Sequence, residues 1–218
     1  MPPRYARSMC TSYGIDPGFT AAADLFGAGG KELLRDLHLW ATSNAAETLL
    51  PTGRHARNRN PIVVGGPRGP RPEAGWWGYL AGGEPVRYAS VNTRSERLLE
   101  RSVPVPGRAL VPATHWFETH RGSRRRFRLG LDGLEAFTMA AVTRPGVPRG
   151  DRAVTCYSIL TQPAAEHLTA VHDRMPVLLP PALADEWLTG RAPSHELVPA
   201  ALEAGRAVAR RVMTARVG

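Results

Sequence analysis

Four side chains of this 218-residue sequence could act together on a carbonyl group, and they are Cys10, Asn92, Glu118 and His172. Cysteine supplies a nucleophile, and histidine can donate or accept a proton near neutral pH. A carboxyl group and an amide can orient such a pair or share its proton transfers. His172 begins a polar triplet inside an apolar frame that runs from residue 168 to residue 180.

Cys10 follows Met9, and this pair reads like a second start of translation. If translation starts at Met9, removal of the methionine leaves Cys10 as the N-terminal residue. Its amine (pKa about 8) and its thiol (pKa about 8.5) could then condense with an aldehyde, first as a Schiff base and then as a thiazolidine ring. The alternative is that Cys10 is a small buried hydrophobic residue, a common role of free cysteines.

Asn92 and Glu118 each have a structural alternative as well. Asn92 stands at the start of a predicted helix, where its side chain could cap the first turn. Glu118 lies among large apolar residues on a predicted kinked strand, residues 109–119. Such surroundings raise the pKa of a carboxyl group and suit it to proton transfer, but a salt bridge to one of the many arginines is an equal alternative.

From the residues alone, the default is a cysteine-nucleophile hydrolase in which His172 is the base and Glu118 or Asn92 orients it. Cleavage of the chain's own Met9–Cys10 bond would remove the leading residues. If those residues remain, the nitrogen of Cys10 is an amide and no thiazolidine can form. A module that binds single strands without chemistry is then the remaining alternative.

The elements that must position these residues are short strands and a few helices. Apolar periodicity predicts helices at residues 31–40, 163–171, 181–188 and 195–204, with a short helical piece at 21–26. Strands are predicted at residues 62–64, 76–80, 109–119, 124–131, 134–142, 153–161 and 211–217. Asp132-Gly133 predicts a hairpin turn that pairs strand 124–131 with strand 134–142. Cys156 lies in the strand 153–161 and is expected to be buried and inert.

Composition narrows the class of protein. Lys and Arg outnumber Asp and Glu by 28 to 19, and nearly all of the positive charge is arginine. Arginine binds phosphates bidentately, so a polyanionic partner fits, although GC-rich coding bias gives a similar composition. Two cysteines suit a reducing, cytoplasmic setting. No apolar run approaches the ~20 residues of a membrane span, and no secretory signal or zinc or phosphate-loop motif is present. We expect no metal, no cofactor and no membrane partner.

The short motifs that carry these residues, taken in their order along the chain, resemble those of the SOS response-associated peptidase (SRAP) family. The likeness covers about residues 9 to 187, and its motifs are Met9-Cys10, Trp77-Gly-Tyr-Leu, Asn92-Thr-Arg-Ser-Glu, Leu110-Val-Pro-Ala with Trp116-Phe-Glu, and His172-Asp-Arg-Met-Pro. The last motif is the most specific. The resemblance implies an α+β fold with a largely antiparallel, barrel-like sheet and peripheral helices. We expect one domain over residues 9–218, after an extension of residues 1–8 that is disordered or removed.

The resemblance implies a different main activity from hydrolysis: covalent capture of abasic sites in single-stranded DNA. Cys10 would form the thiazolidine crosslink with the ring-opened sugar. His172 would protonate the sugar ring oxygen, Glu118 would move protons at the amine, and Asn92 would hold the aldehyde-derived oxygen. We expect a monomer that acts without a cofactor.

The resemblance also implies DNA contacts. Arg94 and Arg174 would hold flanking phosphates, Trp77 and Trp116 would stack on bases, and Pro51 would belong to a turn that touches DNA. The chain departs from the usual family sequence in two motifs. It has Met-Cys-Thr-Ser where most members have Met-Cys-Gly-Arg, and it has Thr-Leu-Leu-Pro at residues 48–51 where Asn-x-x-Pro is usual, so only Pro51 carries over.

Overall fold

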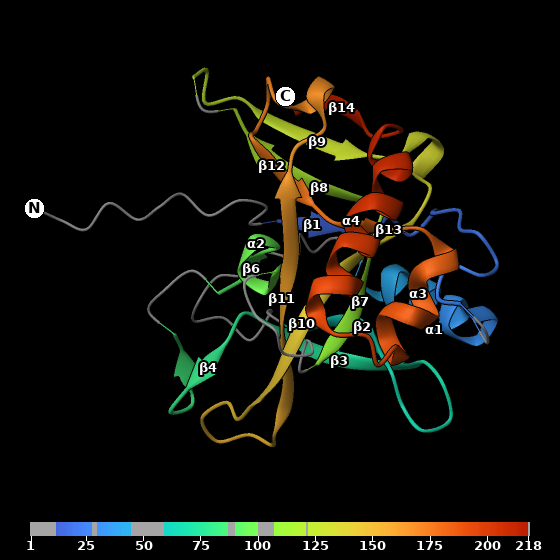
Figure 1. Ribbon diagram of the computed structural model, residues 1–218, viewed down its shortest axis with the longest axis vertical. Coiled ribbons are helices and arrows are strands. Elements are labelled where there is room, and N and C mark those ends of the chain that lie inside the picture. The colour runs from blue at the N-terminus through green and yellow to red at the C-terminus, as the bar shows by residue number, and fades with distance from the viewer. Residues whose placement is uncertain are drawn as a thin grey trace, which may run out of the picture.

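The computed structural model describes residues 12–27, 30–44, 59–86, 90–99, 107–120 and 122–217. Its centre is a barrel of five strands (Figure 1). These strands are β2 (Arg59–Val64), β3 (Arg71–Trp77), β7 (Arg108–Ala113), β10 (Phe137–Gly146) and β11 (Val154–Pro163).

The barrel closes because β10 pairs on both sides. The strand order is β11-β3-β2-β7-β10, and β10 pairs again with β11 over residues 141–146 and 154–159. Every neighbouring pair is antiparallel except β3 and β11, which run parallel with Trp76 opposite Cys156. Closure leaves no unpaired edge among these five strands. The predicted α+β fold with a largely antiparallel, barrel-like sheet is confirmed.

Three short strands extend the barrel. β6 (Asn92–Arg94) and β12 (Arg174–Pro176) both pair with β11, and β13 (Leu178–Leu179) pairs with β10. β4 (Leu80–Ala81) and β5 (Glu84–Pro85) form a separate small hairpin. Because β6 and β12 share β11 as a partner, the predicted site residues of two distant motifs meet on one strand.

A second sheet, here called the small sheet, has the order β1-β8-β9-β14. Its strands are β1 (Tyr13–Gly14), β8 (His115–Thr119), β9 (Arg126–Gly130) and β14 (Met213–Arg216), all antiparallel to their neighbours. Only the buried residue Thr114 separates β8 from β7, which belongs to the barrel. The kinked strand predicted at residues 109–119 is therefore a chain that crosses from one sheet to the other.

The hairpin predicted at Asp132-Gly133 is wrong. β9 pairs with β8 and β14, whereas β10 pairs with β7, β11 and β13. A short 3-10 helix, Asp132–Leu134, joins the two strands, and Gly133 has a φ of +61°. Asp-Gly favours any tight turn with a left-handed residue, so the dipeptide located a turn correctly but did not fix the partner of either strand.

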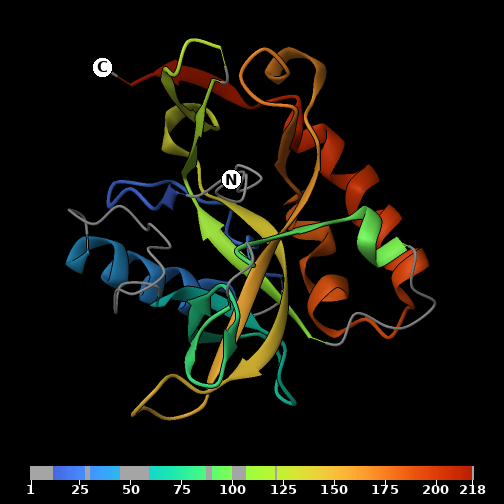
Figure 2. The ribbon, with the colours of Figure 1, turned by 90° about the vertical axis from the view of Figure 1, so that its left-hand side faces the viewer.

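Helices cover the barrel on two sides. They are α1 (Gly30–Ser43), α2 (Glu96–Leu99), α3 (Ala184–Thr189) and α4 (Ser194–Ala209). Figure 2 shows α1 on one side of the barrel strands and α4 on the other. Residues 21–26 form turns rather than the predicted helical piece, which ends before the break at residues 27–30. Among the described residues no helix is long and apolar enough to cross a membrane.

Helix α4 lies unusually close to the barrel at Gly205, and this contact gives a prediction. A Cβ at this position would lie 2.5 Å from the carbonyl oxygen of Leu178. In an unconstrained helix, Gly→Ala stabilises by about 1 kcal/mol. We expect Gly205→Ala to lower the free energy of unfolding by roughly 1–3 kcal/mol instead, because the backbone atoms must separate.

Urea denaturation followed by circular dichroism measures this change. The matched control is Ala207→Gly on the exposed face of the same helix, where propensity alone should cost about 1 kcal/mol. A Gly205→Ala variant as stable as the wild type would contradict the close contact.

Candidate functional site

The described chain begins at Ser12, and Cys10 and Pro51 both lie outside the described residues. Ser12 is buried, and its carbonyl oxygen accepts a hydrogen bond from the backbone N–H of Phe117 (2.8 Å). Tyr13 and Gly14 continue this pairing opposite Trp116 and His115. Residues 12–14 are thus paired along β8, and Ser12 is hydrogen-bonded to the neighbour of Glu118.

Tyr13 ties this first strand to the barrel. Its hydroxyl group lies 2.6 Å from the hydroxyl group of Tyr157, which also accepts a hydrogen bond from Asn60 Nδ2 (3.0 Å). The Tyr13 ring meets Trp77 edge-on, with the ring centroids 4.7 Å apart. All four side chains are buried. β1 is only two residues long, so these contacts do much to hold it in place.

Asn92 lies in β6 rather than at the start of a helix, and the predicted N-cap is wrong. It is aligned with Ile159 of β11, and α2 begins four residues later at Glu96. The carbonyl oxygen of Ser95 accepts the N–H groups of Leu98 and Leu99 (2.9 and 3.2 Å), so Ser95 precedes the helix. Pairing with β11 gives residues 92–94 partners that a helix start would not provide.

Glu118 lies on β8 and is only 5% exposed. Strand alternation places it on the same face as the buried Trp116, while His115 and Phe117 lie on the other face. A carboxyl group in this position is largely removed from bulk water. This placement agrees with the apolar surroundings expected from the sequence.

His172 is 9% exposed and stands directly before β12. Its Nδ1 lies 3.1 Å from the backbone nitrogen of Arg174, which donates to it, and 3.1 Å from Asp173 Oδ1. When Nδ1 accepts, the neutral ring carries its proton on Nε2; when the ring is charged, Nδ1–H can pair with Asp173. Both protonation states therefore have a partner.

The segment that leads to His172 differs from the helix predicted at residues 163–171. Pro163 ends β11, and one 3-10 helix, Glu166–Leu168, follows. The N–H of His172 still donates to the carbonyl oxygen of Leu168 (3.1 Å), so the histidine does follow a helical turn. The strand predicted at residues 153–161 continues two residues further, to Pro163.

Arg174 forms an ion pair with Glu96. Its two terminal nitrogens contact the two carboxylate oxygens, with Nη2 2.8 Å from Oε2, and Nη2 also donates to the Thr161 carbonyl oxygen (3.0 Å). The Arg174 guanidinium lowers the pKa of Glu96 from 4.5 to about 2. The charge of Arg174 is therefore balanced within the protein, so the predicted phosphate contact would compete with Glu96.

Arg94 lies one strand away and in different surroundings. It is exposed at the end of β6 and aligned with Thr161 of β11. No carboxylate of the described residues lies within 4 Å of its guanidinium. Of the two arginines predicted to hold phosphates, Arg94 is the one whose charge faces solvent.

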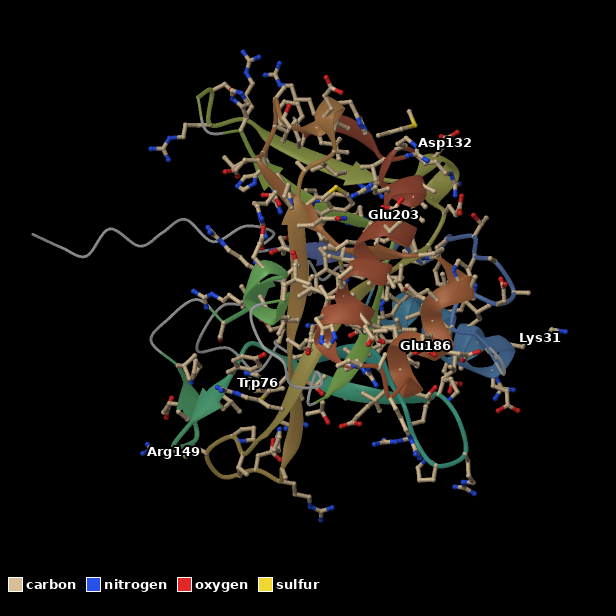
Figure 3. The ribbon with its side chains drawn as sticks, viewed as in Figure 1. Lys31, Trp76, Asp132, Arg149, Glu186 and Glu203 are labelled. Atoms are coloured by element: carbon tan, nitrogen blue, oxygen red, sulfur yellow. The ribbon has the colours of Figure 1, made fainter. Side chains whose placement is uncertain are left out.

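Trp77 and Trp116 are 1% and 0% exposed. The Trp77 ring is parallel to that of Tyr157, and its Nε1 donates to the carbonyl oxygen of Val91 (2.9 Å), the residue before Asn92. Trp116 meets Phe137 edge-on. In this conformation neither ring offers a face to a base, so the predicted stacking conflicts with their burial. Trp77 instead supports the strand that carries Asn92. Its neighbour Trp76 is half-buried (Figure 3).

The parts of the site share one hydrophobic cluster. It contains residues adjacent or close in sequence to each predicted site residue, namely Tyr13, Trp77, Val91, Trp116, Leu168 and Met175. The structure thus brings the start of β1, β6, β8 and β12 onto a common core. Among the described residues, no group of three or more His, Cys, Asp and Glu side chains is arranged to hold a metal ion.

Sequence reasoning missed a charged cluster on the outer face of the small sheet. His115 Nδ1 lies 2.9 Å from Thr114 Oγ1 and 3.0 Å from Arg128 Nη2, and Arg128 pairs with Asp16 (2.9 Å). Burial lowers the pKa of His115 to about 4, and the charge of Arg128 adds to this effect. The ring is therefore neutral at pH 7. The alternation of apolar and basic residues in β9 was the only indication of this face.

Comparison with known proteins relates this arrangement to a family. The family model described as SOS response associated peptidase (SRAP) matches residues 56–217. The abasic site processing protein YedK of Escherichia coli K12 is 34% identical over 119 residues, 52% of this chain and 53% of YedK. The abasic site processing protein YoqW of Bacillus subtilis 168 is 32% identical over 123 residues, 51% and 54% of the two chains. The match spans about half the length of these curated relatives.

Solved structures share the fold. A phage-related protein from Bordetella bronchiseptica superposes with a TM-score of 0.56 at 24% identity, over 78% of this chain and 80% of that protein. A second protein from the same organism gives a TM-score of 0.57 at 18% identity, over 73% and 84% of the two chains.

The ion pair between Glu96 and Arg174 predicts a pH dependence of stability. The pKa of Glu96 is depressed in the folded state, so its stabilisation is complete above about 4.5 and is lost as the pH falls toward 2. Because the Glu96 side chain is 48% exposed, solvent screening reduces the effect to about 1 kcal/mol. Glu96→Gln should lower the free energy of unfolding by this amount at pH 7 and by progressively less below pH 4.5.

Urea denaturation of both proteins between pH 7 and pH 3 tests this expectation. Glu166→Gln, which changes an exposed glutamate in the turn before His172, is the control and should track the wild type at every pH. A constant difference between Glu96→Gln and the wild type over this range would show that Glu96 acts through something other than its charge.

Proposed function

This chain belongs to the SOS response-associated peptidase (SRAP) family, and on that basis we propose that it processes abasic sites in single-stranded DNA by bonding covalently to them through Cys10. Two relatives about one-third identical to it are named abasic site processing proteins. The observation that supports the proposal most directly is the backbone hydrogen bond between Ser12 and Phe117, because it pairs residues close to Cys10 in sequence with the strand that carries the buried Glu118.

Covalent geometry relates Cys10 to this site. Ser12 is held against Phe117, the neighbour of Glu118. Consecutive α-carbons are about 3.8 Å apart, so a residue two positions before Ser12 has its α-carbon within about 7–8 Å of that of Ser12. The covalent chain thus sets an upper limit on the separation between Cys10 and a residue that is paired with β8.

The proposed reaction requires a free amine on Cys10. This nitrogen adds to the aldehyde carbon of the ring-opened abasic sugar, and the carbinolamine loses one water to give a Schiff base. The sulfur then adds to the same carbon, and the thiol proton passes to the nitrogen. The product is a thiazolidine, one water is released, and nothing is oxidised or reduced.

The buried residues supply the proton transfers. His172 with its proton on Nε2 donates to the sugar ring oxygen as the ring opens. Glu118 accepts a proton from the attacking amine and returns it to the departing water. Asn92 donates a hydrogen bond to the oxygen that leaves. Glu118 and His172 are 5% and 9% exposed, and this low exposure reduces competition from water.

The DNA contacts divide between two arginines. Arg94, exposed at the end of β6, binds a flanking phosphate. Arg174 donates hydrogen bonds to Glu96 and to the Thr161 carbonyl oxygen, and its backbone N–H donates to His172 Nδ1, so we assign it to positioning of the histidine.

A peptidase is the second candidate, because Cys10 follows nine residues and cleavage of the Met9–Cys10 bond would expose its amine.

Intact mass spectrometry tests the proposal. We expect the protein expressed from its own gene to begin at Cys10 and to gain the mass of a single-stranded oligonucleotide that carries one abasic site, less one water. Cys10→Ala should give no stable adduct, because it removes the sulfur that closes the ring, and a Schiff base formed by the remaining amine is reversed by water.

Cys156→Ser is the matched control, because the only other cysteine is buried in β11 and its pKa is raised by burial. It should form the adduct at the wild-type rate. A protein that keeps residues 1–9 and forms no adduct would contradict covalent capture. Loss of residues 1–9 in the wild type but not in Cys10→Ala would favour self-cleavage as the origin of the mature form.

The proton-transfer roles give a kinetic prediction. Glu118→Gln keeps the size and hydrogen-bonding capacity of the side chain but removes its ability to exchange a proton. We expect its rate of adduct formation to fall by about 10²–10⁴-fold, the usual contribution of general acid–base catalysis. Quenched time courses resolved by denaturing electrophoresis measure the rate. The exposed Glu166→Gln is the control, and an unchanged rate in Glu118→Gln would exclude Glu118 from proton transfer.

A further inference from the structure

The guanidinium of Arg126 lies at the start of the described chain. Its Nη2 donates a hydrogen bond to Ser12 Oγ (3.1 Å), although the two residues are far apart in sequence. Arg126 begins β9, where it is aligned with Thr119 of β8, the residue after Glu118. A cation is thereby held two residues from Cys10 and next to the strand of Glu118.

The position of this guanidinium is well defined by its neighbours. It lies over the ring of Phe117, with Cζ 3.9 Å from the ring centroid. The carbonyl oxygen of Arg126 accepts the N–H of Val217 (3.0 Å), and β9 is paired on both sides by β8 and β14. Stacking on an aromatic face and a paired backbone reduce the freedom that an exposed arginine would otherwise lose on binding.

Arg126 differs from the other arginines of this region in its charge balance. Arg128 is paired with Asp16, and Arg174 is paired with Glu96. No carboxylate of the described residues lies within 4 Å of Arg126, and one hydrogen bond to Ser12 uses only one of its five N–H groups. Its positive charge also contributes to the lowered pKa of His115, after burial and Arg128.

The surroundings of Arg126 are basic as well. Arg124 and Arg125 precede it in the exposed turn between β8 and β9. Figure 3 shows side chains with nitrogen at their ends around this turn, at the opposite end of the molecule from Arg149. An ordered guanidinium with free donors in a basic region is suited to an anion that presents two oxygens side by side, as a phosphate does.

We propose that Arg126 binds a phosphate of the DNA strand next to the abasic sugar, on the β8–β9 side of the site. This inference rests on the proposed function for the identity of the anion. The donors left free on the guanidinium approach two oxygens of one phosphate, while the contact to Ser12 holds the guanidinium at the strand that follows Cys10 in sequence. Arg126 and Arg94 then hold the strand from two different elements.

The test compares a substrate that carries phosphates with one that does not. Arg126→Gln should capture an abasic oligonucleotide about tenfold more slowly than the wild type, because one charge-assisted contact is lost. Its reaction with 2-deoxyribose, an aldehyde without phosphate, should be unchanged. Replacing the phosphates on either side of the abasic site by uncharged methylphosphonates should slow the wild type about tenfold more than it slows Arg126→Gln, which has only the Arg94 contact left to lose.

Two controls separate the alternatives. Arg149→Gln removes an exposed charge far from the site and should behave as the wild type. Arg126→Lys keeps the charge without the bidentate geometry and should fall between the wild type and Arg126→Gln. A loss of reaction with both substrates would show that Arg126 only positions the N-terminal strand, and no loss with either would show that it is a solvated surface residue. Both results overturn the proposal.

Failure of the proposed function is distinguishable from failure of this inference. If the wild type captures abasic DNA and Arg126→Gln captures it equally well, only the inference fails. If the wild type forms no adduct, the inference is tested by the affinity for an unmodified single-stranded oligonucleotide. Fluorescence anisotropy measures this affinity at several salt concentrations. Arg126→Gln should then reduce the slope of log K against log salt by about 0.7, the value of one phosphate contact, and an unchanged slope would overturn the inference.

Discussion

A hydrogen bond between two buried phenols, those of Tyr13 and Tyr157, joins the first strand of the small sheet to the barrel. Without a partner, either hydroxyl group would carry a desolvation cost of about 1–3 kcal/mol. Asn60 adds a second donor at Tyr157, and Trp77 packs against both rings. β1 has only two residues and one neighbouring strand, so its position depends on these contacts.

Strand β11 organises the remainder of the site. It pairs with β3 and β10 inside the barrel and also with the short strands β6 and β12. Asn92 and Arg94 enter from one motif and His172 and Arg174 from another, and both motifs are registered against the same ten-residue strand. The ion pair between Arg174 and Glu96 joins these two motifs directly. A rigid platform of this kind can hold proton-transfer groups in fixed relative positions.

The arginines of this chain differ in what balances their charge. A net charge of +9 indicates affinity for polyanions but gives no position for it. Arg128 and Arg174 are balanced by Asp16 and Glu96, whereas Arg94 and Arg126 face no carboxylate of the described residues. Among the arginines close to the candidate site, those of β6 and of the β8–β9 turn therefore carry charge that no carboxylate of the described residues balances.

The sequence by itself determined the order of the motifs, the family and the class of fold, because local residue types and apolar periodicity encode them. It located α1, α3, α4 and the strands around Glu118 and Cys156, since their patterns are long or strongly apolar. Only the tertiary structure decided which strands pair, because pairing depends on burial between distant segments; it placed β9 beside β8 rather than β10, and Asn92 in a strand. It also decided which polar side chains have partners. The fold brings the guanidinium of Arg126 to Ser12, a contact between residues that no local pattern connects.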